Sequence, residues 1–370
     1  MRVTRVELRD FRNYEAARVE LGHGLTVVAG PNGAGKSNLI EAVYFGCTAR
    51  SPRTSNEREL VRRGAALTRV VLDTHDEEAA HRIEVGYEPG EPKLIRVDDS
   101  PLDSLAVTPA RPLVSVFLPE RLELVKGPPS ARRAHLDQVV AALWPARAAT
   151  RTGYSRALAQ RNALLGRIRA GIASPAALDA WDAELAAQGI RLMGDRAEAA
   201  AGLVAPFEEL AEALGLPGRA ELSYRPRSAA GDAEALAAEL AERRAADLER
   251  GFTAHGPHRD ELRLSLDGAA LRAYGSQGQQ RAALLALLFA ERSLLAERRA
   301  RPPLMLLDDV MSELDAERRG LLAGLLRSGG QAIVTATETE HVPGADPGGT
   351  DVLRVDRGTV SSARQAVAAG

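Results

Sequence analysis

The feature that most constrains this sequence is the segment Gly30-Pro31-Asn32-Gly33-Ala34-Gly35-Lys36-Ser37, which fits the phosphate-binding pattern G-x-x-x-x-G-K-[ST]. The run Leu25–Ala29 before it is typical of a short buried strand. After it, Leu39, Ile40 and Val43 fall at helical spacing. We therefore expect a strand, a glycine loop and a helix whose positive N-terminus faces a phosphate.

The chemistry of such a loop assigns roles to its residues. Lys36 would reach the β- and γ-phosphates of ATP, and the Ser37 hydroxyl would bind Mg²⁺. Lysine is rare here, with only Lys36, Lys93 and Lys126 among 48 basic residues, so its position in the loop is informative. We expect ATP and Mg²⁺ as ligands, and an ATP-binding set of Gly30, Pro31, Asn32, Gly33, Ala34, Gly35, Lys36, Ser37 and Asn38.

A phosphate loop also needs a carboxylate at the end of a neighbouring strand. The apolar run Leu304–Leu307 is followed directly by Asp308 and Asp309, as in a Walker B segment. Asp308 would hold Mg²⁺ through water, and Asp309 would orient or deprotonate the attacking water. A strand with an Asp-rich turn would explain the segment taken alone, but its combination with Lys36 favours the catalytic interpretation.

The segment Ser276-Gln277-Gly278-Gln279 precedes an apolar helical run at 282–289. Ser276 and Gln279 have the spacing of a capping box, which is a purely structural explanation. The order of elements favours a second one. In ATP-binding cassettes a signature of type Ser-x-Gly-Gln lies before Walker B and contacts the γ-phosphate held by a second subunit, and this segment resembles it.

Two further segments resemble parts of the same class. Ser312 and Asp315, directly after Walker B, resemble a D-loop. Transporters carry a switch histidine after the following strand, where this chain has Thr335-Ala336-Thr337. We assign the γ-phosphate sensor to Thr337, which completes a catalytic set with Lys36, Asp308 and Asp309.

The pattern along the chain predicts an α/β protein interrupted by helices. A length of 370 residues allows two domains, or one large domain with an insertion. We expect an N-terminal lobe at 1–129, a helical insertion at 130–250 and a C-terminal lobe at 251–370, with the two lobes forming one ATPase head. The insertion could be a compact helical subdomain or an antiparallel helix pair forming a short arm. Without sustained heptads it does not read as a long coiled coil.

Composition limits the functional classes. The longest apolar stretch, 282–290, is less than half of the ~20 residues that span a bilayer, so we expect no membrane segment and a cytoplasmic location. A single cysteine, Cys47, permits no internal disulfide, and it leaves little material for a structural metal site. A net charge of −2 neither supports nor excludes DNA binding.

Several strings together resemble the RecF family of bacterial recombination-repair ATPases, in the order in which that family carries them. Besides the glycine loop and the 276–281 segment, they are Phe11-Arg12-Asn13-Tyr14, Arg50-Ser51-Pro52-Arg53-Thr54, Phe117-Leu118-Pro119-Glu120, Gln160-Arg161-Asn162-Ala163-Leu164-Leu165 and Gly256-Pro257-His258-Arg259-Asp260-Glu261. The resemblance spans essentially the whole chain. The departures are Ser37 where the family often has threonine, Glu261 where aspartate is common, and the alanine-rich insertion.

This resemblance implies an SMC-like ATPase head of the ABC type with an inserted α-helical domain. ATP would close a head-to-tail homodimer, with Ser276, Gln277, Gly278 and Gln279 acting on the nucleotide of the partner. Such proteins are weak, DNA-stimulated ATPases that bind single- and double-stranded DNA at gaps and junctions. They act with RecO and RecR to load RecA in gap repair and the SOS response. The candidate DNA phosphate contacts are Arg53, Arg62, Arg63, Arg132 and Arg133.

Two other functions remain open at this point. The nucleotide-binding subunit of a membrane transporter would share the ATP motifs, although the helical insertion, the missing switch histidine and Gln277 argue against it. A structural tether that never hydrolyses ATP is disfavoured because Lys36, Asp308 and Asp309 are all present.

Overall fold

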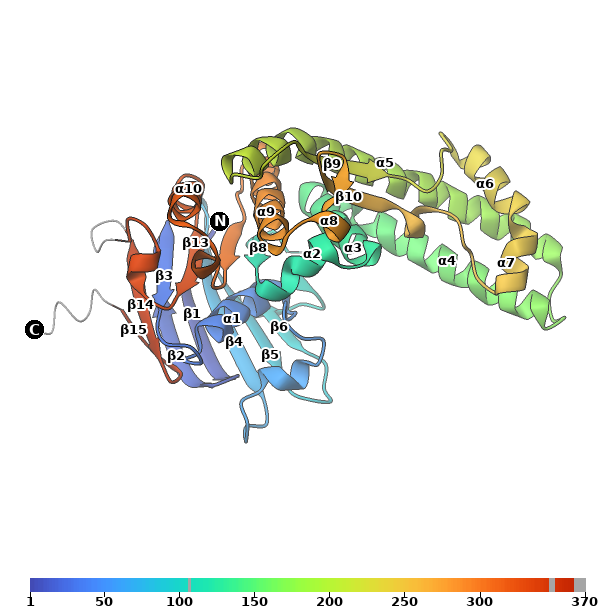
Figure 1. The fold of residues 1–370 in the computed structure, drawn as a ribbon. Coiled ribbons are helices and arrows are strands. Elements are labelled where there is room, and N and C mark those ends of the chain that lie inside the picture. Colours follow the sequence, from blue (N-terminus) through green and yellow to red (C-terminus); the bar gives the residue numbers. More distant parts are fainter. Residues whose placement is uncertain (106–107, 346–349, 363–370) are drawn as a thin grey trace, which may run out of the picture. The chain divides into compact units, whose positions relative to one another are not determined.

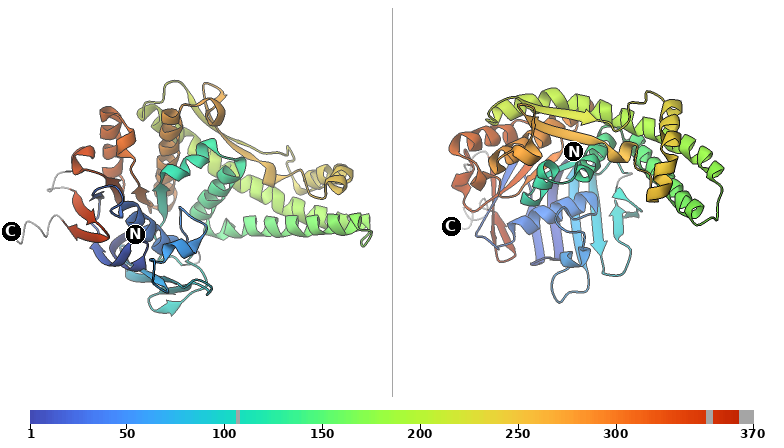
Figure 2. Two further views of the ribbon diagram at one scale, coloured as in Figure 1. Left: turned by 60° about the horizontal axis from the view of Figure 1, so that its bottom comes forward. Right: turned by 45° about the vertical axis from the view of Figure 1, so that its right-hand side comes forward.

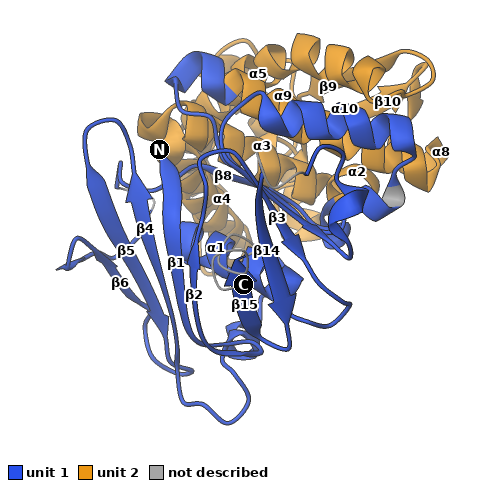
Figure 3. Cartoon of the chain, turned by 90° about the vertical axis from the view of Figure 1, so that its left-hand side faces the viewer, with its two compact units in different colours: residues 1–121, 295–370 blue, residues 122–294 orange. Residues whose placement is uncertain are grey.

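The computed structural model describes residues 1–105, 108–345 and 350–362. It divides into two compact units, the first made of residues 1–121 and 295–370 and the second of residues 122–294 (Figures 1 and 3). The two ends of the chain therefore share one unit around an inserted second unit. The junctions, at 121/122 and 294/295, differ from the lobe boundaries expected at 129/130 and 250/251.

The first unit contains two six-stranded sheets. In the first sheet the order is β2-β1-β4-β5-β6-β7 and every neighbouring pair is antiparallel. Its strands are β1 (Arg2–Phe11), β2 (Tyr14–Glu20), β4 (Thr68–His75), β5 (Ala80–Tyr87), β6 (Leu94–Val97) and β7 (Ser100–Pro101).

The second sheet has the order β15-β14-β3-β13-β12-β8, and all its pairs are parallel except β14 with β15. Its strands are β3 (Leu25–Ala29), β8 (Val114–Phe117), β12 (Leu304–Leu307), β13 (Ala332–Ala336), β14 (Asp351–Asp356) and β15 (Thr359–Ser362). Strands β3, β12 and β13 are buried along their whole length, as expected for central parallel strands.

Helix α1 (Lys36–Thr48) lies between the two sheets and contacts strands of both (Figure 3). Phe45 on this helix packs against Phe11 of the first sheet, and their ring centroids are 6.0 Å apart. One hydrophobic core includes α1 and both sheets. The other helices of this unit are η1 (Glu57–Leu60), η7 (Met311–Glu313), α10 (Ala316–Arg327) and η8 (Thr339–His341).

The second unit combines helices with a small antiparallel sheet of order β11-β10-β9. The strands are β9 (Ala220–Arg225), β10 (Glu261–Leu266) and β11 (Ala269–Ala270). Because β10 pairs with β9 from the middle of the insertion, residues after 250 belong to this unit. The helices are α2 (Glu123–Lys126), α3 (Pro129–Leu143), η4 (Pro145–Arg147), α4 (Ala148–Arg169), η5 (Pro175–Ala177), α5 (Leu178–Ala213), α6 (Ala233–Glu242), α7 (Arg244–Arg250), η6 (Pro257–Arg259) and α8 (Leu271–Tyr274).

Helices α4 and α5 pack along each other and are joined through η5 (Figures 1 and 2). Leu178, Leu185 and Leu192 of α5 are buried. Helix α9 (Gln277–Arg299) and the short η3 (Pro119–Leu122) cross the boundaries between the units along the chain. Within the described residues, no helix combines the length and apolarity that a membrane crossing requires.

Candidate functional site

The loop at 30–37 connects β3 to α1, as its sequence pattern predicts. Two of its glycines are fixed by backbone geometry. Gly35 has φ +122°, and a Cβ on it would lie 2.7 Å from the Asn13 amide nitrogen. A Cβ on Gly30 would lie 2.2 Å from the carbonyl oxygen of Val355 in β14. The loop therefore runs too close to its surroundings to accept larger residues at these positions.

Lys36 begins helix α1 and folds its side chain back over the loop. Its Nζ donates hydrogen bonds to the carbonyl oxygens of Gly30 at 2.8 Å and Pro31 at 3.0 Å. Burial lowers the pKa of Lys36, and the carboxylates of Asp309 and Asp308 counteract this by raising it. Helix α1 has no side-chain cap and no acidic residue in its first turn, so its N-terminus is left available to an anion.

The parallel sheet brings Asp308 and Asp309 next to β13. Strand β13 lies between β3, which leads into the loop, and β12, which leads into the two aspartates. The Thr335 hydroxyl donates to Asp308 Oδ1 at 2.7 Å and accepts from the Asp309 N–H at 2.8 Å. Asp308 is buried, whereas Asp309 is exposed and has φ +49°. Thr335 thus fixes one aspartate by its side chain and the next by its backbone.

Sequence reasoning missed Thr335, although it lies two residues before Thr337. The parallel register pairs Leu307 with Val334, so the next residues along both strands are neighbours. A threonine at the end of the strand beside Walker B was the available signal. Thr337, the predicted sensor, is partly exposed, and its hydroxyl lies 3.2 Å from His341 Nδ1.

A buried carboxylate on α1 ties the loop to two other segments. Glu41 is fully buried and pairs with Arg12 through two 2.8 Å hydrogen bonds. It also accepts from Ser51 Oγ at 2.6 Å and from Arg53 at 3.3 Å. The segments 11–14 and 50–54 therefore meet at one acidic side chain on α1, the helix that follows the phosphate loop.

Asn13 extends this network to the loop backbone. Its amide donates to the carbonyl oxygen of Ala34 at 3.0 Å and accepts from Asn38 at 2.8 Å. The neighbouring Tyr14 hydroxyl donates to the carbonyl oxygen of Gly35 at 2.9 Å. The turn between β1 and β2 thus fixes the loop through the carbonyl oxygens of Ala34 and Gly35.

The predicted signature segment lies in the second unit at the start of α9. The Ser276 N–H donates to Gln279 Oε1 at 2.8 Å, and the Gln279 N–H donates to Ser276 Oγ at 3.2 Å. This reciprocal pair is a capping box, so the structural explanation of the spacing is correct. Ser276, Gln277 and Gly278 are nevertheless exposed, which leaves the segment accessible to a ligand.

The two D-loop residues have local roles. Ser312 Oγ donates to the Asp309 carbonyl oxygen at 3.0 Å, which links this segment to Walker B. Asp315 is the N-cap of α10 and accepts from the Arg318 N–H at 2.9 Å.

The five arginines that were candidate DNA contacts differ in their burial and in their hydrogen-bond partners. Arg132 is only 3% exposed, and its guanidinium pairs with Glu261 at 2.7 Å and donates to carbonyl oxygens of residues 124, 125 and 127. A buried guanidinium with these partners is not presented to DNA, so the prediction for Arg132 is corrected: it is a structural residue. Arg53 pairs with Glu41, and Arg62 pairs with Asp10 at 2.7 Å.

Two of these arginines have no carboxylate hydrogen bond among the described residues. Arg63 is exposed in the first unit. Arg133 is half-buried in the second unit and donates to the carbonyl oxygen of Asp260 at 2.7 Å.

The residues present fit a magnesium site in which phosphate oxygens of the substrate and water complete the coordination. No group of three or more His, Cys, Asp or Glu side chains able to hold a metal ion occurs in the described part of the chain. Mg²⁺ is usually bound by one or two protein oxygens together with phosphates and water rather than by a full protein cage. The Ser37 hydroxyl and the Asp308 carboxylate are the oxygens that this chain would supply.

Comparison with known proteins agrees with this geometry. Residues 5–101 match the model of a family described as an AAA domain. The "DNA replication and repair protein RecF" of Streptomyces avermitilis is 38% identical over 363 residues, which cover 93% of this chain and 95% of that protein. The protein of the same name from Heliobacterium modesticaldum is 34% identical over 373 residues, covering 99% and 100%.

Solved structures give the same result. A structure described as the recombination mediator protein RecF-ATP in the RecFOR pathway has a TM-score of 0.86 and 28% identity, and 97% of each chain is covered. An SMC head bound to the C-winged helix domain of ScpA has a TM-score of 0.61 at 17% identity, which shows a shared fold. With an SMC-like α/β head, a phosphate loop beside Asp308 and relatives that match over nearly its whole length, this chain belongs to the RecF family of DNA replication and repair proteins.

Proposed function

We propose that this chain is an ATP-dependent clamp for DNA repair, which dimerises when ATP is bound and opens after slow hydrolysis. The observation that carries this proposal is the meeting of three parts at neighbouring parallel strands: Lys36 over the loop, and Asp308 and Asp309 joined by Thr335. These are the parts that phosphoryl transfer to water requires, because that reaction depends on positioning and charge stabilisation.

The roles of the individual residues follow from their positions. Backbone N–H groups of the loop and the N-terminus of α1 would bind the phosphates. Lys36 would exchange its two carbonyl partners for the β- and γ-phosphates. The negative phosphates would then compensate the positive charge of Lys36, which burial disfavours. Asp309, exposed beside Lys36, would orient or deprotonate the attacking water, and Thr337 would sense the γ-phosphate. Mg²⁺, when bound by Ser37 and Asp308, would neutralise developing charge on the phosphates.

Dimerisation is proposed through the exposed segment 276–279. Ser276 lies 240 positions beyond Lys36, and in ABC ATPases this segment acts on the nucleotide of the other subunit. Ser276, Gln277 and Gly278 are exposed, so the start of α9 is accessible to a nucleotide phosphate. Each of two nucleotides would then be held between the loop of one subunit and the Ser276 segment of the other.

DNA is the proposed partner of the closed dimer, with gaps and junctions of single and double strands as its sites. RecO and RecR would act with it to load RecA, and the protein would work in the cytoplasm, where bacterial DNA lies. Arg63 is the favoured phosphate contact of the first unit because it is exposed and has no carboxylate hydrogen bond among the described residues. Family membership sets aside the transporter subunit as an alternative.

Sedimentation of the full chain with and without ATP, on gapped and on blunt duplexes, tests the proposal directly. We expect a monomer without nucleotide and a dimer with ATP and Mg²⁺, with preferential binding of the dimer to the gapped duplex. Lys36→Met should remove the ATP-dependent dimer, and Lys126→Met, at an exposed lysine of α2, is the matched control. A Lys36→Met protein that still dimerises with ATP would contradict the clamp.

The DNA contact has its own test. Arg63→Glu should weaken duplex binding and reduce the slope of log affinity against log salt by about 1. Arg167→Glu, at an exposed arginine of α4, serves as the control for a general effect of charge. Equal slopes for wild type and Arg63→Glu would remove Arg63 from the proposed interface.

A further inference from the structure

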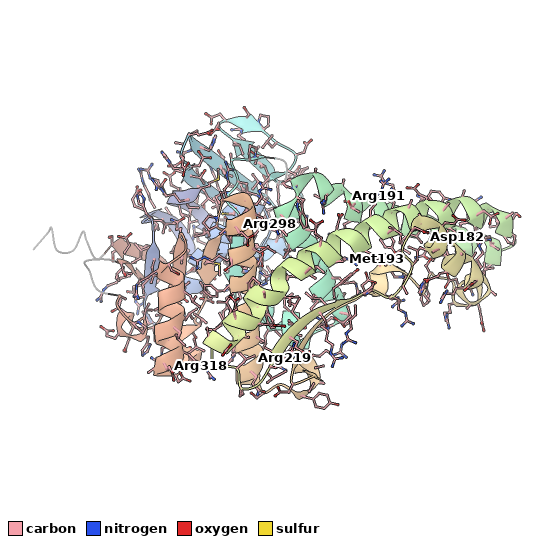
Figure 4. The ribbon with its side chains drawn as sticks, turned by 90° about the horizontal axis from the view of Figure 1, so that it is seen from above. Asp182, Arg191, Met193, Arg219, Arg298 and Arg318 are labelled. Atoms are coloured by element: carbon pink, nitrogen blue, oxygen red, sulfur yellow. The ribbon has the colours of Figure 1, made fainter. Side chains whose placement is uncertain are left out.

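Two of the sequence segments that resemble the RecF family have no part in the proposed nucleotide site. They lie at 160–165 on α4 and at 256–261 around η6, both inside the second unit. Arg161, buried on α4, pairs with Asp182 of α5 at 2.6 Å and with Asp247 at 2.7 Å. Figure 4 labels Asp182 on the long helix α5. The strings therefore form part of a polar interior within this unit.

Thr253 connects the two strings. Asn162 Oδ1 accepts from the Thr253 N–H at 2.8 Å and from its hydroxyl at 2.7 Å. The ring of His258 lies 3.0 Å, through Nε2, from the Thr253 carbonyl oxygen and 2.7 Å, through Nδ1, from the Tyr154 hydroxyl. A carbonyl can only accept, so Nε2 carries a proton. Burial lowers the pKa of His258 to about 4, so the ring is neutral at pH 7 and its Nδ1 accepts from the Tyr154 hydroxyl.

A cavity of about 390 Å³, within the size range of small-molecule sites, adjoins this network. Tyr154, Asn162 and His258 form part of its wall. Its charged lining side chains are three arginines and one aspartate, namely Arg133 and Asp137 of α3, Arg151 of α4 and Arg196 of α5. The cavity therefore carries an excess of positive charge in its wall.

The arginines differ in how far that charge is compensated. Arg196 is buried and its charge is compensated, because it forms two hydrogen bonds with Asp137 at 2.7 and 3.1 Å and also contacts Asp260 and the Pro257 carbonyl oxygen. Arg151 contacts the same Asp137 at 3.3 Å, and its side chain is 60% exposed. One carboxylate is thus shared by two guanidinium groups.

Arg133 is the least compensated of the three. Its one hydrogen bond among the described residues goes to the backbone carbonyl oxygen of Asp260, which carries no net charge. Burial lowers the pKa of Arg133, and the nearby charge of Arg196 lowers it further, while Glu261 acts in the opposite direction. The opposite charge of an anion in the cavity would offset both the cost of burial and the repulsion from Arg196.

Hydroxyl donors complete the lining. Ser130 and Ser155 line the cavity with the arginines and are exposed. Two guanidinium groups with free donors, next to hydroxyl and amide groups, match the several acceptor oxygens of a tetrahedral oxyanion. We propose that this cavity is a phosphate-binding site of the second unit, with Arg133 and Arg151 as its charged ligands and Arg196 as the residue that positions Asp137.

The phosphate group has two possible sources, a free phosphate or nucleotide and the backbone of a DNA strand. The test uses the full chain with its P-loop saturated by ADP and Mg²⁺, so that phosphate binding there does not contribute. Inorganic phosphate and a short single-stranded oligonucleotide are titrated separately by calorimetry. We expect the double variant Arg133→Gln/Arg151→Gln to weaken at least one of them by about tenfold or more.

Controls separate this effect from misfolding and from general charge. Arg156→Gln, at an exposed arginine of α4 that does not line the cavity, should change neither affinity by more than about twofold. Ser155→Asp keeps the arginines but adds a negative charge at an exposed position, so it should weaken the same ligand without loss of folding. Thermal melting of each variant reports on the fold.

The pattern of losses identifies the source. Loss for inorganic phosphate alone assigns the site to a free phosphate compound, and loss for the oligonucleotide assigns it to a DNA phosphate. If Ser155→Asp and the folded double variant both bind the two probes with wild-type affinity, the proposed site is wrong. ATP-dependent sedimentation of the same variants is expected to be normal, so a failure of this site is distinguishable from a failure of the clamp.

Discussion

Thr335 donates its hydroxyl proton to Asp308 across two neighbouring parallel strands, over a distance of 2.7 Å. The same oxygen accepts a hydrogen bond from the N–H of Asp309. The backbone of Asp309 lies in the left-handed region. Non-glycine residues adopt this conformation at some energetic cost, and such strain is often retained at functional sites. One threonine thus holds both aspartates of the proposed catalytic centre.

Replacement of Thr335 by valine keeps the shape of the side chain and removes both hydrogen bonds. Because Asp308 is buried, we expect a loss of about 1–3 kcal/mol in the free energy of unfolding and a fall of about tenfold or more in ATP turnover. Urea unfolding and steady-state hydrolysis measure the two effects. Thr337→Val should lower turnover with unchanged stability, so equal stability of the two variants would refute the role of Thr335.

Asp309→Asn should preserve the backbone turn and remove the group proposed to act on water. Asparagine tolerates the left-handed conformation as well as aspartate does. We expect ATP binding and dimerisation to persist while hydrolysis stops, so the dimer should remain closed with intact ATP. Sedimentation with analysis of the bound nucleotide checks this, and rapid turnover by the variant would assign the role to another residue.

Glu41→Gln should destabilise the first unit. The carboxylate is fully buried and pairs with Arg12 and Arg53, so its neutralisation leaves positive charge poorly compensated. A loss of about 2–4 kcal/mol is expected on chemical denaturation. Glu59→Gln is the matched control, because Glu59 contacts the same Arg12 at 3.5 Å from a half-exposed position and should cost less than about 1 kcal/mol. Similar losses for both variants would contradict the central position of Glu41.

Arg132→Gln should act on folding of the second unit and not directly on DNA. Its guanidinium is buried and joins Glu261 to the carbonyl oxygens at the end of α2, so we expect a loss of about 2–4 kcal/mol. Arg156→Gln should leave stability within about 0.5 kcal/mol. A stable Arg132→Gln protein with weakened DNA binding would restore the original prediction of a DNA contact.

The neutral state of His258 predicts a dependence of stability on pH. Its folded-state pKa of about 4 lies below the ordinary value of 6.5, so between these values the unfolded chain binds more protons than the folded one. The stabilisation is present above pH 6.5 and is lost as pH falls towards 4, with an upper limit of about 3 kcal/mol. His258→Gln should remove this component from unfolding free energies measured at pH 7 and pH 4.5. His75→Gln, at an exposed histidine, is the control and should show the same difference in unfolding free energy between the two pH values as the wild type. If His258→Gln also shows the wild-type difference, the assignment to His258 is wrong.

The sequence by itself determined the central parts of the proposed nucleotide site. Local order was sufficient there, because a buried strand, a glycine loop and a helix follow one another within 25–48, and Leu304–Leu307 leads directly into its aspartates. Strands also form at 2–11, 68–75 and 94–97, where alternating and apolar residues are local signals. The family resemblance rested on such short strings and is confirmed by relatives over almost the entire chain.

Only the tertiary structure decided how distant segments meet. Strand β10 reads like any strand of the head, yet it pairs with β9 in the second unit, because pairing depends on partners far away in sequence. Arg132 and Arg63 are the same residue type, but Arg132 is buried against Glu261 and Arg63 is exposed. Thr335 became significant only through the parallel register beside Asp308, and the cavity around Arg133 only through the packing of three helices. Periodicity records which way a side chain faces within its own element, whereas burial, pairing and charge compensation depend on what the fold places opposite.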